Sequence, residues 1–228
     1  MRITLEPAFI LHHRPYRETS VIIDFLTQHH GRITAVARGT KGRFRGILQP
    51  FIPLLISWSG KSEMVTLTEA ESHGAPIMLQ GNCLFSAFYL NELLVRLLHK
   101  HDPCTLIFDL YHETLLALQG DTLQQKILRI FEKKLLEQLG YALHLNDKIQ
   151  TEKYYRYIPE LGFKLYDDYE NAPSNWVFLG KHLLAFSADN LEDADVLRDA
   201  KRLMRLALTP LLGPKPLHSR KLFQEVEK

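Results

Sequence analysis

The sequence predicts an α+β chain in which a five-stranded N-terminal β-barrel precedes an α-helical domain. Two observations support this prediction. The first 70 or so residues contain five short runs, apolar or alternating in polarity, that end at turn-forming residues. From about residue 79 onward, apolar residues recur instead at the three- and four-residue spacing of helices.

The expected strands are separated by turn signals such as Arg14-Pro15 and Ser59-Gly60. They cover residues 8–12, 19–27, 31–38, 50–58 and 64–71. In the third run, alternation places Ile33, Ala35 and Ala37 on one face. Five strands of this length leave no exposed sheet edge when they close into a small barrel. We therefore expect an OB-fold, and a small SH3-like barrel is the alternative.

The helical part begins after Pro76, where the apolar spacing changes. Gly140 is a good helix stop, and Ser187 is the expected N-cap before the fourth helix. The expected helices cover residues 82–99, 103–119, 123–139, 193–208 and a last short stretch at 220–226. The predicted domains are an OB-fold at 1–78 and a helical domain at 79–228, with an irregular insertion at 144–190. Within the insertion, residues 154–157, 162–163 and 176–178 indicate irregular or short β structure.

The composition is that of a globular protein, because 46% of the 228 residues are hydrophobic and 24% are charged. Cys83 and Cys104 form no CxxC pair, so thiolates cannot build a zinc ribbon. Free thiols suit a reducing cytoplasm. We find no secretory signal and no apolar run long enough to span a bilayer. The expected location is the cytoplasm, in association with the nucleoid.

Positive charge is concentrated in the N-terminal third, although the net charge is only +2. Residues 1–61 contain nine Lys or Arg against three acidic residues, whereas residues 81–228 contain 19 against 20. Polyanion binding is therefore a hypothesis about the N-terminal third alone. The alternative is a basic surface that only contacts solvent.

The stretch RITAVARGTKGRFRGILQ (32–49) has no acidic residue and intersperses glycines among its cations. Such cations suit a phosphate backbone, and an aromatic ring can stack on a base. Arg14 and Arg17 lie in the first expected turn, which OB-folds commonly use for ligands. Phe44 would equally suit packing on the barrel. The candidate DNA-binding residues of this region are Arg14, Arg17, Arg32, Arg38, Lys41, Arg43, Phe44 and Arg45.

The sequence contains no catalytic triad, phosphate-binding loop or nuclease-like carboxylate cluster, so we expect neither an enzyme nor a cofactor. The segment HKHDPC (99–104) lacks the ligand spacing of a zinc site, and surface or capping histidines are expected there. Two other functions remain open. One is an RNA-binding OB-fold protein in RNA metabolism, and the other is a metal-dependent nuclease, against which the missing carboxylate cluster argues.

Five segments of the chain are informative together: AFILHHRPYRETSVIIDFLTQHHGRITAVARGTKG (8–42), LQPFIPLLISWSGKSEMVTLTEAES (48–72), YLNELLVRLL (89–98), ILRIFEKKLLEQLGYAL (127–143) and DADVLRDAKRLMRLALTPLLGPKPLHSRKLF (193–223). In this order they resemble the RecO family of bacterial recombination mediators. The resemblance spans most of the chain. It implies an OB-fold followed by a helical domain.

The resemblance also implies a function without catalysis. Family members bind single- and double-stranded DNA and anneal complementary strands. They help to load RecA on DNA coated by single-stranded DNA-binding protein (SSB), work with RecR and contact the acidic C-terminal tail of SSB. Many carry a four-cysteine zinc module after the helices, but residues 144–182 contain no cysteine. Aromatic packing would replace the metal here, through Tyr154, Tyr157, Phe163, Trp176 and Phe178.

Two helical stretches combine cations with apolar residues and are candidate binding surfaces. The first would bind the SSB tail, although an ordinary amphipathic helix has the same pattern. Its residues are Lys126, Leu128, Arg129, Phe131 and Lys133. The second lies near the C-terminus and would extend the DNA path or bind a partner. Its residues are Arg202, Arg205, Arg220 and Lys221.

Overall fold

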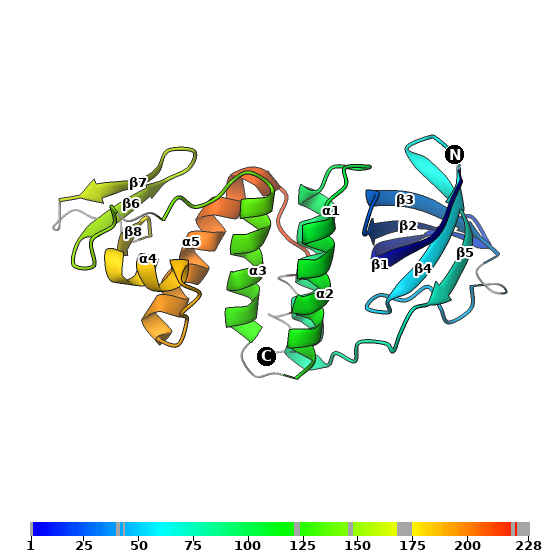
Figure 1. The fold of residues 1–228 in the computed structure, drawn as a ribbon, viewed down its shortest axis with the longest axis horizontal. Helices are drawn as coiled ribbons and strands as arrows, with labels where there is room; N and C mark the ends of the chain where they lie inside the picture. Colours follow the sequence, from blue (N-terminus) through cyan, green and yellow to red (C-terminus); the bar gives the residue numbers. More distant parts are fainter. Residues whose placement is uncertain are drawn as a thin grey trace. The chain divides into compact units, whose positions relative to one another are not determined.

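The computed structural model of the chain describes residues 2–39, 42, 44–120, 124–145, 148–167, 175–219 and 222. All five expected strands are present, with somewhat different ends. They are β1 (Arg2–Tyr16), β2 (Ser20–Thr27), β3 (Gly31–Arg38), β4 (Leu54–Ser59) and β5 (Met64–Ser72). These strands, blue to cyan in Figure 1, close into a barrel in the order β1-β2-β3-β5-β4.

The strand order identifies the barrel type. The long strand β1 pairs with β2 and also with β4, so that Ala8 faces Thr27 on one side and Leu54 on the other. Strands β3 and β5 run parallel, and all other neighbours are antiparallel. A five-stranded barrel of this kind is an OB-fold. The OB-fold prediction is confirmed, and the SH3-like alternative is wrong.

The barrel interior is filled by alternate side chains of the strands. Ile33, Ala35 and Ala37 of β3 all lie in this core, as their alternation in the sequence predicted. Ile23 and Phe25 of β2 are fully buried beside them. The period-two pattern of polarity therefore decides which face of each strand points inward.

Two helices belong to the same compact unit as the barrel. They are α1 (Gly81–Leu97) and α2 (Thr105–Gln119). The first unit comprises residues 1–122 and 216–228, and the second comprises residues 123–215. The domain boundary expected between residues 78 and 79 thus falls between β5 and α1 in the sequence, within the first unit.

A buried polar network joins α1 and α2 to β1. The pairing of β1 with β2 is irregular between Ile10 and His12, which leaves Leu11 outside the ladder. The side-chain amide of Asn91 donates to the Leu11 carbonyl oxygen at 2.9 Å, and the Tyr111 hydroxyl donates to the Asn91 side-chain oxygen. The carbonyl that the bulge releases from the ladder thereby gains a partner from a helix.

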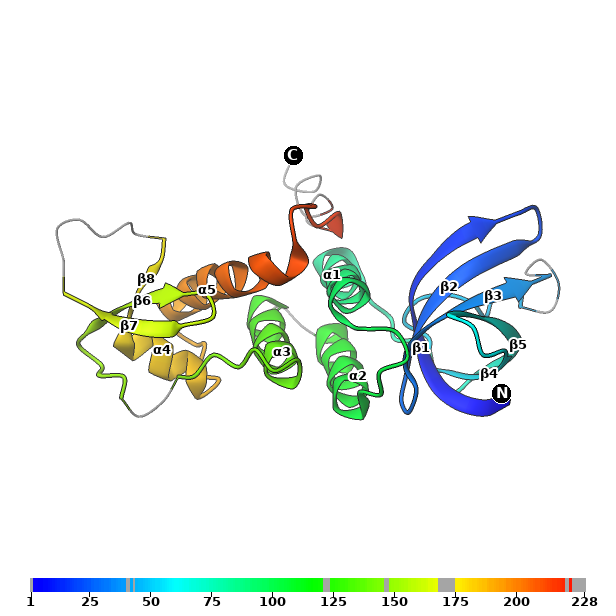
Figure 2. The same ribbon diagram turned by 90° about the horizontal axis from the view of Figure 1, so that it is seen from above.

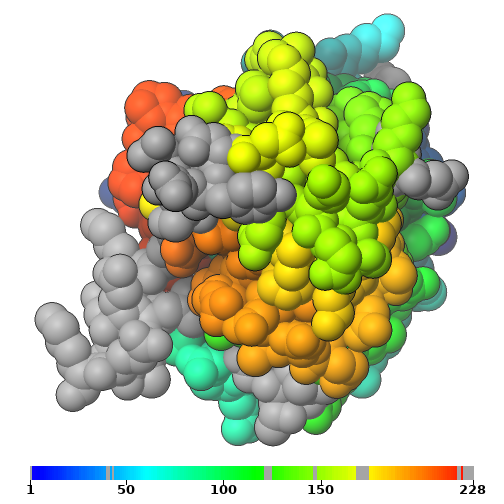
Figure 3. Space-filling model, turned by 90° about the vertical axis from the view of Figure 1, so that its left-hand side faces the viewer, coloured from blue at the N-terminus to red at the C-terminus, as the bar shows by residue number. Residues whose placement is uncertain are grey.

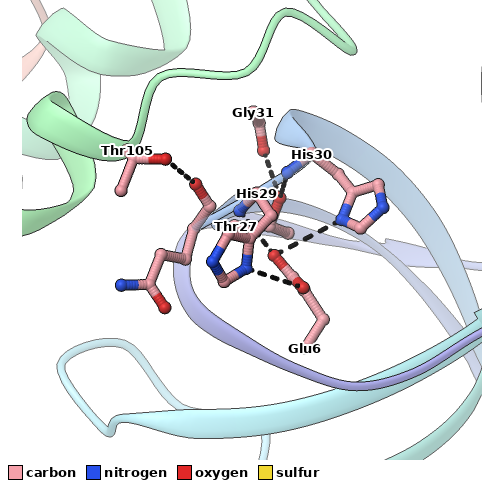
Figure 4. Close-up of polar contacts among 7 residues, drawn as sticks. Glu6, Thr27, His29, His30, Gly31 and Thr105 are labelled. Carbon is pink, nitrogen blue, oxygen red and sulfur yellow. Dashed lines mark hydrogen bonds and ion pairs between the residues drawn. The ribbon is translucent and has the colours of Figure 1, made fainter.

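The β2–β3 turn is also held by polar contacts (Figure 4). The buried carboxylate of Glu6 accepts a hydrogen bond from the backbone N–H of His29 at 2.6 Å. The Nδ1 atoms of His29 and His30 lie 3.3 and 3.4 Å from its two oxygens. The Thr105 hydroxyl, at the start of α2, donates to the Gln28 carbonyl at 2.9 Å. This turn is therefore anchored to both β1 and α2.

The C-terminal segment returns to α1. The Glu92 carboxylate accepts hydrogen bonds from the backbone N–H groups of His218 and Ser219 and from the Ser219 hydroxyl, at 2.7–2.9 Å. Arg96 donates to the Pro216 carbonyl at 3.3 Å. Burial opposes ionisation of Glu92, but the hydrogen bonds from Ser219 and His218 outweigh it and lower the pKa of this carboxyl. The last expected helix, 220–226, lies outside the described residues except for position 222.

The second unit consists of helices around a small sheet. Its helices are α3 (Gln124–Gln138), α4 (Gly180–Ser187) and α5 (Ala194–Leu212). Its strands are β6 (Tyr154–Ile158), β7 (Gly162–Tyr166) and β8 (Val177–Leu179), in the order β7-β6-β8. Figure 3 shows the surface formed by β6 and β7 (yellow-green) together with α4 and α5 (yellow-orange to orange).

The expected N-cap at Ser187 is wrong, because Ser187 is the last residue of α4. The helix that follows, α5, begins later and is capped by Asp193, whose carboxylate accepts from the backbone N–H of Asp195 at 2.8 Å. The sequence analysis missed α4 because its eight residues, GKHLLAFS, are too few to show a helical period.

Part of the expected irregular insertion, 144–190, is an ordered sheet. Tyr157 and Phe178 are buried, and the rings of Tyr157 and Phe163 lie 5.3 Å apart. Burial also raises the pKa of the Tyr157 phenol. Trp176 is half-buried and Tyr154 is 40% exposed. Three of the five aromatic residues that the sequence indicated thus form the packed centre of this sheet.

Other expectations concern thiols, membranes and metals. Cys83 and Cys104 are half-buried and form no disulfide, and burial raises the pKa of the Cys104 thiol to about 11. No helix in the described part of the chain is long and apolar enough to cross a membrane. Within the same residues, no three His, Cys, Asp or Glu side chains come together to hold a metal ion.

Candidate nucleic-acid interface

The turn between β1 and β2 lies next to the end of β3. Ser20 pairs with Tyr16 on one side and with Arg38 on the other. The backbone N–H of Gly39 donates to the Thr19 carbonyl at 2.9 Å, which ties the start of the next loop to this turn. Figure 2 shows the β1–β2 turn and the end of β3 projecting away from α1 and α2. We call the described residues of this part of the barrel, 14–20, 38, 39, 42 and 45, the distal rim.

The distal rim carries four exposed cations, Arg14, Arg17, Arg38 and Arg45. Among the described residues, none of the four forms an ion pair with a carboxylate. Glu18 is the acidic residue of the turn and is exposed beside them. Arginines that are not in an ion pair can bind phosphate groups without breaking one. Two further predicted residues, Lys41 and Arg43, lie outside the described residues.

Arg32 has a structural role that the sequence analysis did not predict. It lies at the beginning of β3, where its side chain is only 14% exposed. Its guanidinium pairs with Asp24 at 3.3 Å and donates to the Leu98 carbonyl at 3.0 Å. The backbone N–H of His101 in turn donates to the Arg32 carbonyl at 2.9 Å. Arg32 therefore connects the barrel to the end of α1 rather than to the distal rim.

Phe44 is buried and cannot stack on a base in this structure. Its side chain is 4% exposed and belongs to the core of the barrel. Ile47, Leu48 and Ile52 pack against the same core, so the β3–β4 loop covers an opening of the barrel with its apolar residues. Of the two roles that the sequence left open for Phe44, the structure has the packing on the barrel, and such burial stabilises a fold by about 1.5–3 kcal/mol.

The four predicted cations near the C-terminus differ from one another. Arg202 lies with its guanidinium 4.4 Å from the ring centre of Phe178, donates to the Val177 carbonyl at 2.7 Å and pairs with Asp199 at 3.1 Å. Arg202 therefore fastens α5 to β8. Arg205 is exposed. The other two predicted residues, Arg220 and Lys221, lie outside the described residues.

Lys133 of α3 caps another helix. Its ammonium group donates to the carbonyls of Phe186 and Ser187 at 3.0 and 2.8 Å and pairs with Asp189. These carbonyls belong to the last turn of α4, where the backbone has unsatisfied acceptors and a partial negative charge. The sequence analysis assigned Lys133 to a partner, whereas the structure uses it within the second unit.

The other residues of α3 that were predicted to bind the SSB tail are also in internal ion pairs or buried. Lys126 pairs with Glu192 at 2.6 Å, and Arg129 pairs with the buried Glu132. Leu128 is 7% exposed and Phe131 is 1% exposed, so both belong to the core. Of the cations on α3, Lys134 is exposed to solvent. Helical periodicity alone cannot distinguish such internal pairs from a surface that binds a partner.

An OB-fold barrel with a basic rim, joined to a helical part, places the chain among proteins whose fold commonly serves nucleic-acid binding. Comparison with known proteins identifies the family. A model for the N-terminal region of recombination protein O matches residues 1–75, and a model for its C-terminal region matches residues 79–221. The chain belongs to the RecO family of DNA repair proteins.

Relatives in this family are similar along nearly their whole length. The DNA repair protein RecO of Coxiella burnetii (strain RSA 331 / Henzerling II) is 46% identical over 97% of this chain and 98% of its own. RecO of Cellvibrio japonicus is 47% identical over 98% of both chains. RecO of Haemophilus influenzae (strain 86-028NP) is 41% identical over 99% of this chain and 98% of its own. The family prediction is confirmed, and it assigns a role in DNA repair and recombination.

Proposed function

We propose that this RecO-family protein binds single- and double-stranded DNA on the distal rim and promotes annealing of complementary strands. The observation that carries the proposal is the group of exposed arginines at the β1–β2 turn and the end of β3. Arginine neutralises phosphates and makes paired hydrogen bonds to them. Neutralisation reduces the repulsion between two strands, so that they can approach and pair.

The test measures fluorescence anisotropy of a labelled single-stranded oligonucleotide at several salt concentrations. Arg14→Ala/Arg38→Ala removes two rim cations, and the control Arg156→Ala/Lys164→Ala removes two exposed cations on β6 and β7 of the second unit. Each phosphate contact contributes about 0.7 to the slope of log K against log salt for a single strand. The rim variant should therefore lose about 1.4 of this slope and most of its annealing activity, while the control keeps both.

An unchanged slope in the rim variant would place DNA elsewhere, for example near the exposed Arg205 of α5. The same titration with RNA of the same sequence tests the alternative function. Tighter binding of RNA than of DNA would favour a role in RNA metabolism. Loss of substrate length in the presence of magnesium would instead reveal a nuclease.

We also infer that the protein assists RecA loading on SSB-coated DNA, with RecR and the SSB tail as partners. Family membership supports this inference. Contact of the tail with Lys126 or Lys133 would require their internal ion pairs to open, whereas Lys134 is already exposed. The test is anisotropy of a labelled acidic peptide that ends in an apolar residue. Lys134→Ala should weaken its binding, and equal binding would exclude Lys134.

A further inference from the structure

An aromatic residue stands among the cations of the distal rim. Tyr16 is the last residue of β1 and is separated from Arg14 by one residue, so that both side chains leave the same face of the sheet. Across the ladder, Tyr16 pairs with Ser20, and Ser20 pairs with Arg38. Residues directly opposite one another lie about 5 Å apart, so a tyrosine, a serine and an arginine form a row across three strands.

The ring of Tyr16 is accessible from solvent. Its side chain is half-buried, and the guanidinium carbon of the exposed Arg17 lies 5.1 Å from the ring centre. This face of the ring is thus in contact with a side chain that is itself exposed to solvent. The small side chain of Ser20 fills little of the space between Tyr16 and Arg38. In contrast to Phe44, Tyr16 therefore presents an aromatic face next to phosphate-binding groups.

The backbone at this point has an unusual conformation. Arg17 is a non-glycine residue with φ +56°, in the left-handed region. Such conformations are disfavoured for residues with a side chain and cluster at functional sites. In this turn the Arg17 guanidinium lies over the ring of Tyr16. The cation occupies the position that a flat heterocycle would take.

We propose that Tyr16 is a stacking site for an unpaired nucleobase, which displaces the Arg17 guanidinium so that Arg17 is free to bind a phosphate. The proposal rests on the proposed function, because it needs nucleic acid on the distal rim. It adds a preference for substrate: a single strand offers free base faces, whereas bases within a duplex are already stacked on one another. The rim arginines bind the backbone of either form, and Tyr16 distinguishes them.

The experiment compares three labelled oligonucleotides of equal length: a single strand, the same strand with abasic positions, and a duplex. The proteins are wild type, Tyr16→Ala, Tyr16→Phe and the control Tyr141→Ala, which removes a tyrosine that is 54% exposed in the second unit. Loss of one aromatic–base contact should weaken single-strand binding about 5- to 150-fold. We expect this loss in Tyr16→Ala only, with unchanged binding of the abasic strand and duplex and an unchanged salt slope.

The outcomes separate the two claims. If the wild type binds with a steep salt dependence but Tyr16→Ala binds the normal strand equally well, the stacking site is refuted and the proposed function stands. Equal losses for the normal and abasic strands would also refute stacking, because they would show that Tyr16 acts through the backbone or the fold. A wild type that binds none of the three oligonucleotides would overturn both claims. Tyr16→Phe retains the ring and should bind as the wild type does.

Discussion

The buried network of Asn91 and Tyr111 leads to a quantitative prediction about stability. Asn91 is 2% exposed and Tyr111 is fully buried, so neither side chain can replace a lost partner with water. Burial raises the pKa of the Tyr111 phenol well above its ordinary range, so the hydroxyl keeps its proton and remains a donor. Tyr111→Phe deletes that donor and leaves the Asn91 side-chain oxygen unsatisfied.

An unsatisfied buried polar group costs about 1–3 kcal/mol, which is the expected loss for Tyr111→Phe. Asn91→Ala removes the hydrogen-bond partner of two groups, the Leu11 carbonyl and the Tyr111 hydroxyl, and also leaves a cavity. Its expected loss is about 2–5 kcal/mol. In the double variant only the Leu11 carbonyl lacks its partner. The penalties for the Asn91 oxygen and the Tyr111 hydroxyl are both absent from the double variant, so the two losses should fall short of additivity by about 2–3 kcal/mol.

Urea-induced unfolding, followed by tryptophan fluorescence and circular dichroism, measures these free energies. Thr114→Val is a matched control, because the buried Thr114 hydroxyl only donates to the Leu110 carbonyl of its own helix. It should cost less than about 1 kcal/mol. A Tyr111→Phe variant within about 0.5 kcal/mol of the wild type, or fully additive losses, would refute the reasoning.

Three further predictions concern the first unit. Gly31→Ala should lower the melting temperature far more than Gly39→Ala. Both glycines have positive φ, but only a Cβ at Gly31 would lie 1.9 Å from the Asp102 carbonyl oxygen. Equal shifts in thermal denaturation would contradict this reasoning. Arg17→Gly should stabilise the fold by up to about 1 kcal/mol in urea titrations by relieving the positive φ, yet reduce the salt slope for single strands by about 0.7. A loss of stability would argue against backbone strain at Arg17, and an unchanged salt slope would argue against phosphate binding by its side chain. Glu92→Gln should be less stable than the wild type at about pH 7, and the difference in their free energies of unfolding should shrink as pH falls. The sign follows from the lowered pKa of Glu92: its stabilisation is present above the ordinary Glu value of 4.5 and is lost as pH falls through the lower folded-state pKa. A gap that is constant with pH in urea titrations would show that charge is not involved.

Much of the fold could be predicted because hydrophobic patterning is local. Alternation in residues 31–38 was enough to orient Ile33 and Ala35, and strand β3 begins and ends where it was expected. The three-stranded sheet of the second unit was less accessible, because its strands are three to five residues long. Helix α4 was missed for the same reason. Short elements carry too few residues for a period to appear.

The candidate interface could be predicted only in outline. A count of charges identified the N-terminal third, and Arg14, Arg17 and Arg38 are indeed exposed there. No local pattern distinguished Arg38 from Arg32, which alternation places on the same face of the same strand. Tyr16 was not noticed, although an aromatic residue between two arginines in RPYRE is a usable signal.

The sequence by itself determined the barrel, the helical character of the later part and the location of the basic segment, because composition and periodicity are properties of neighbouring residues. The family also follows from the sequence alone, through its similarity to known members. Only the tertiary structure decided what each cation and each ring does. Arg32 and Lys133 are used to satisfy backbone carbonyls, and Phe44 is used to fill the barrel. These assignments depend on groups that are distant in the chain, and a polar or apolar side chain is used wherever folding leaves an unsatisfied group or an open space.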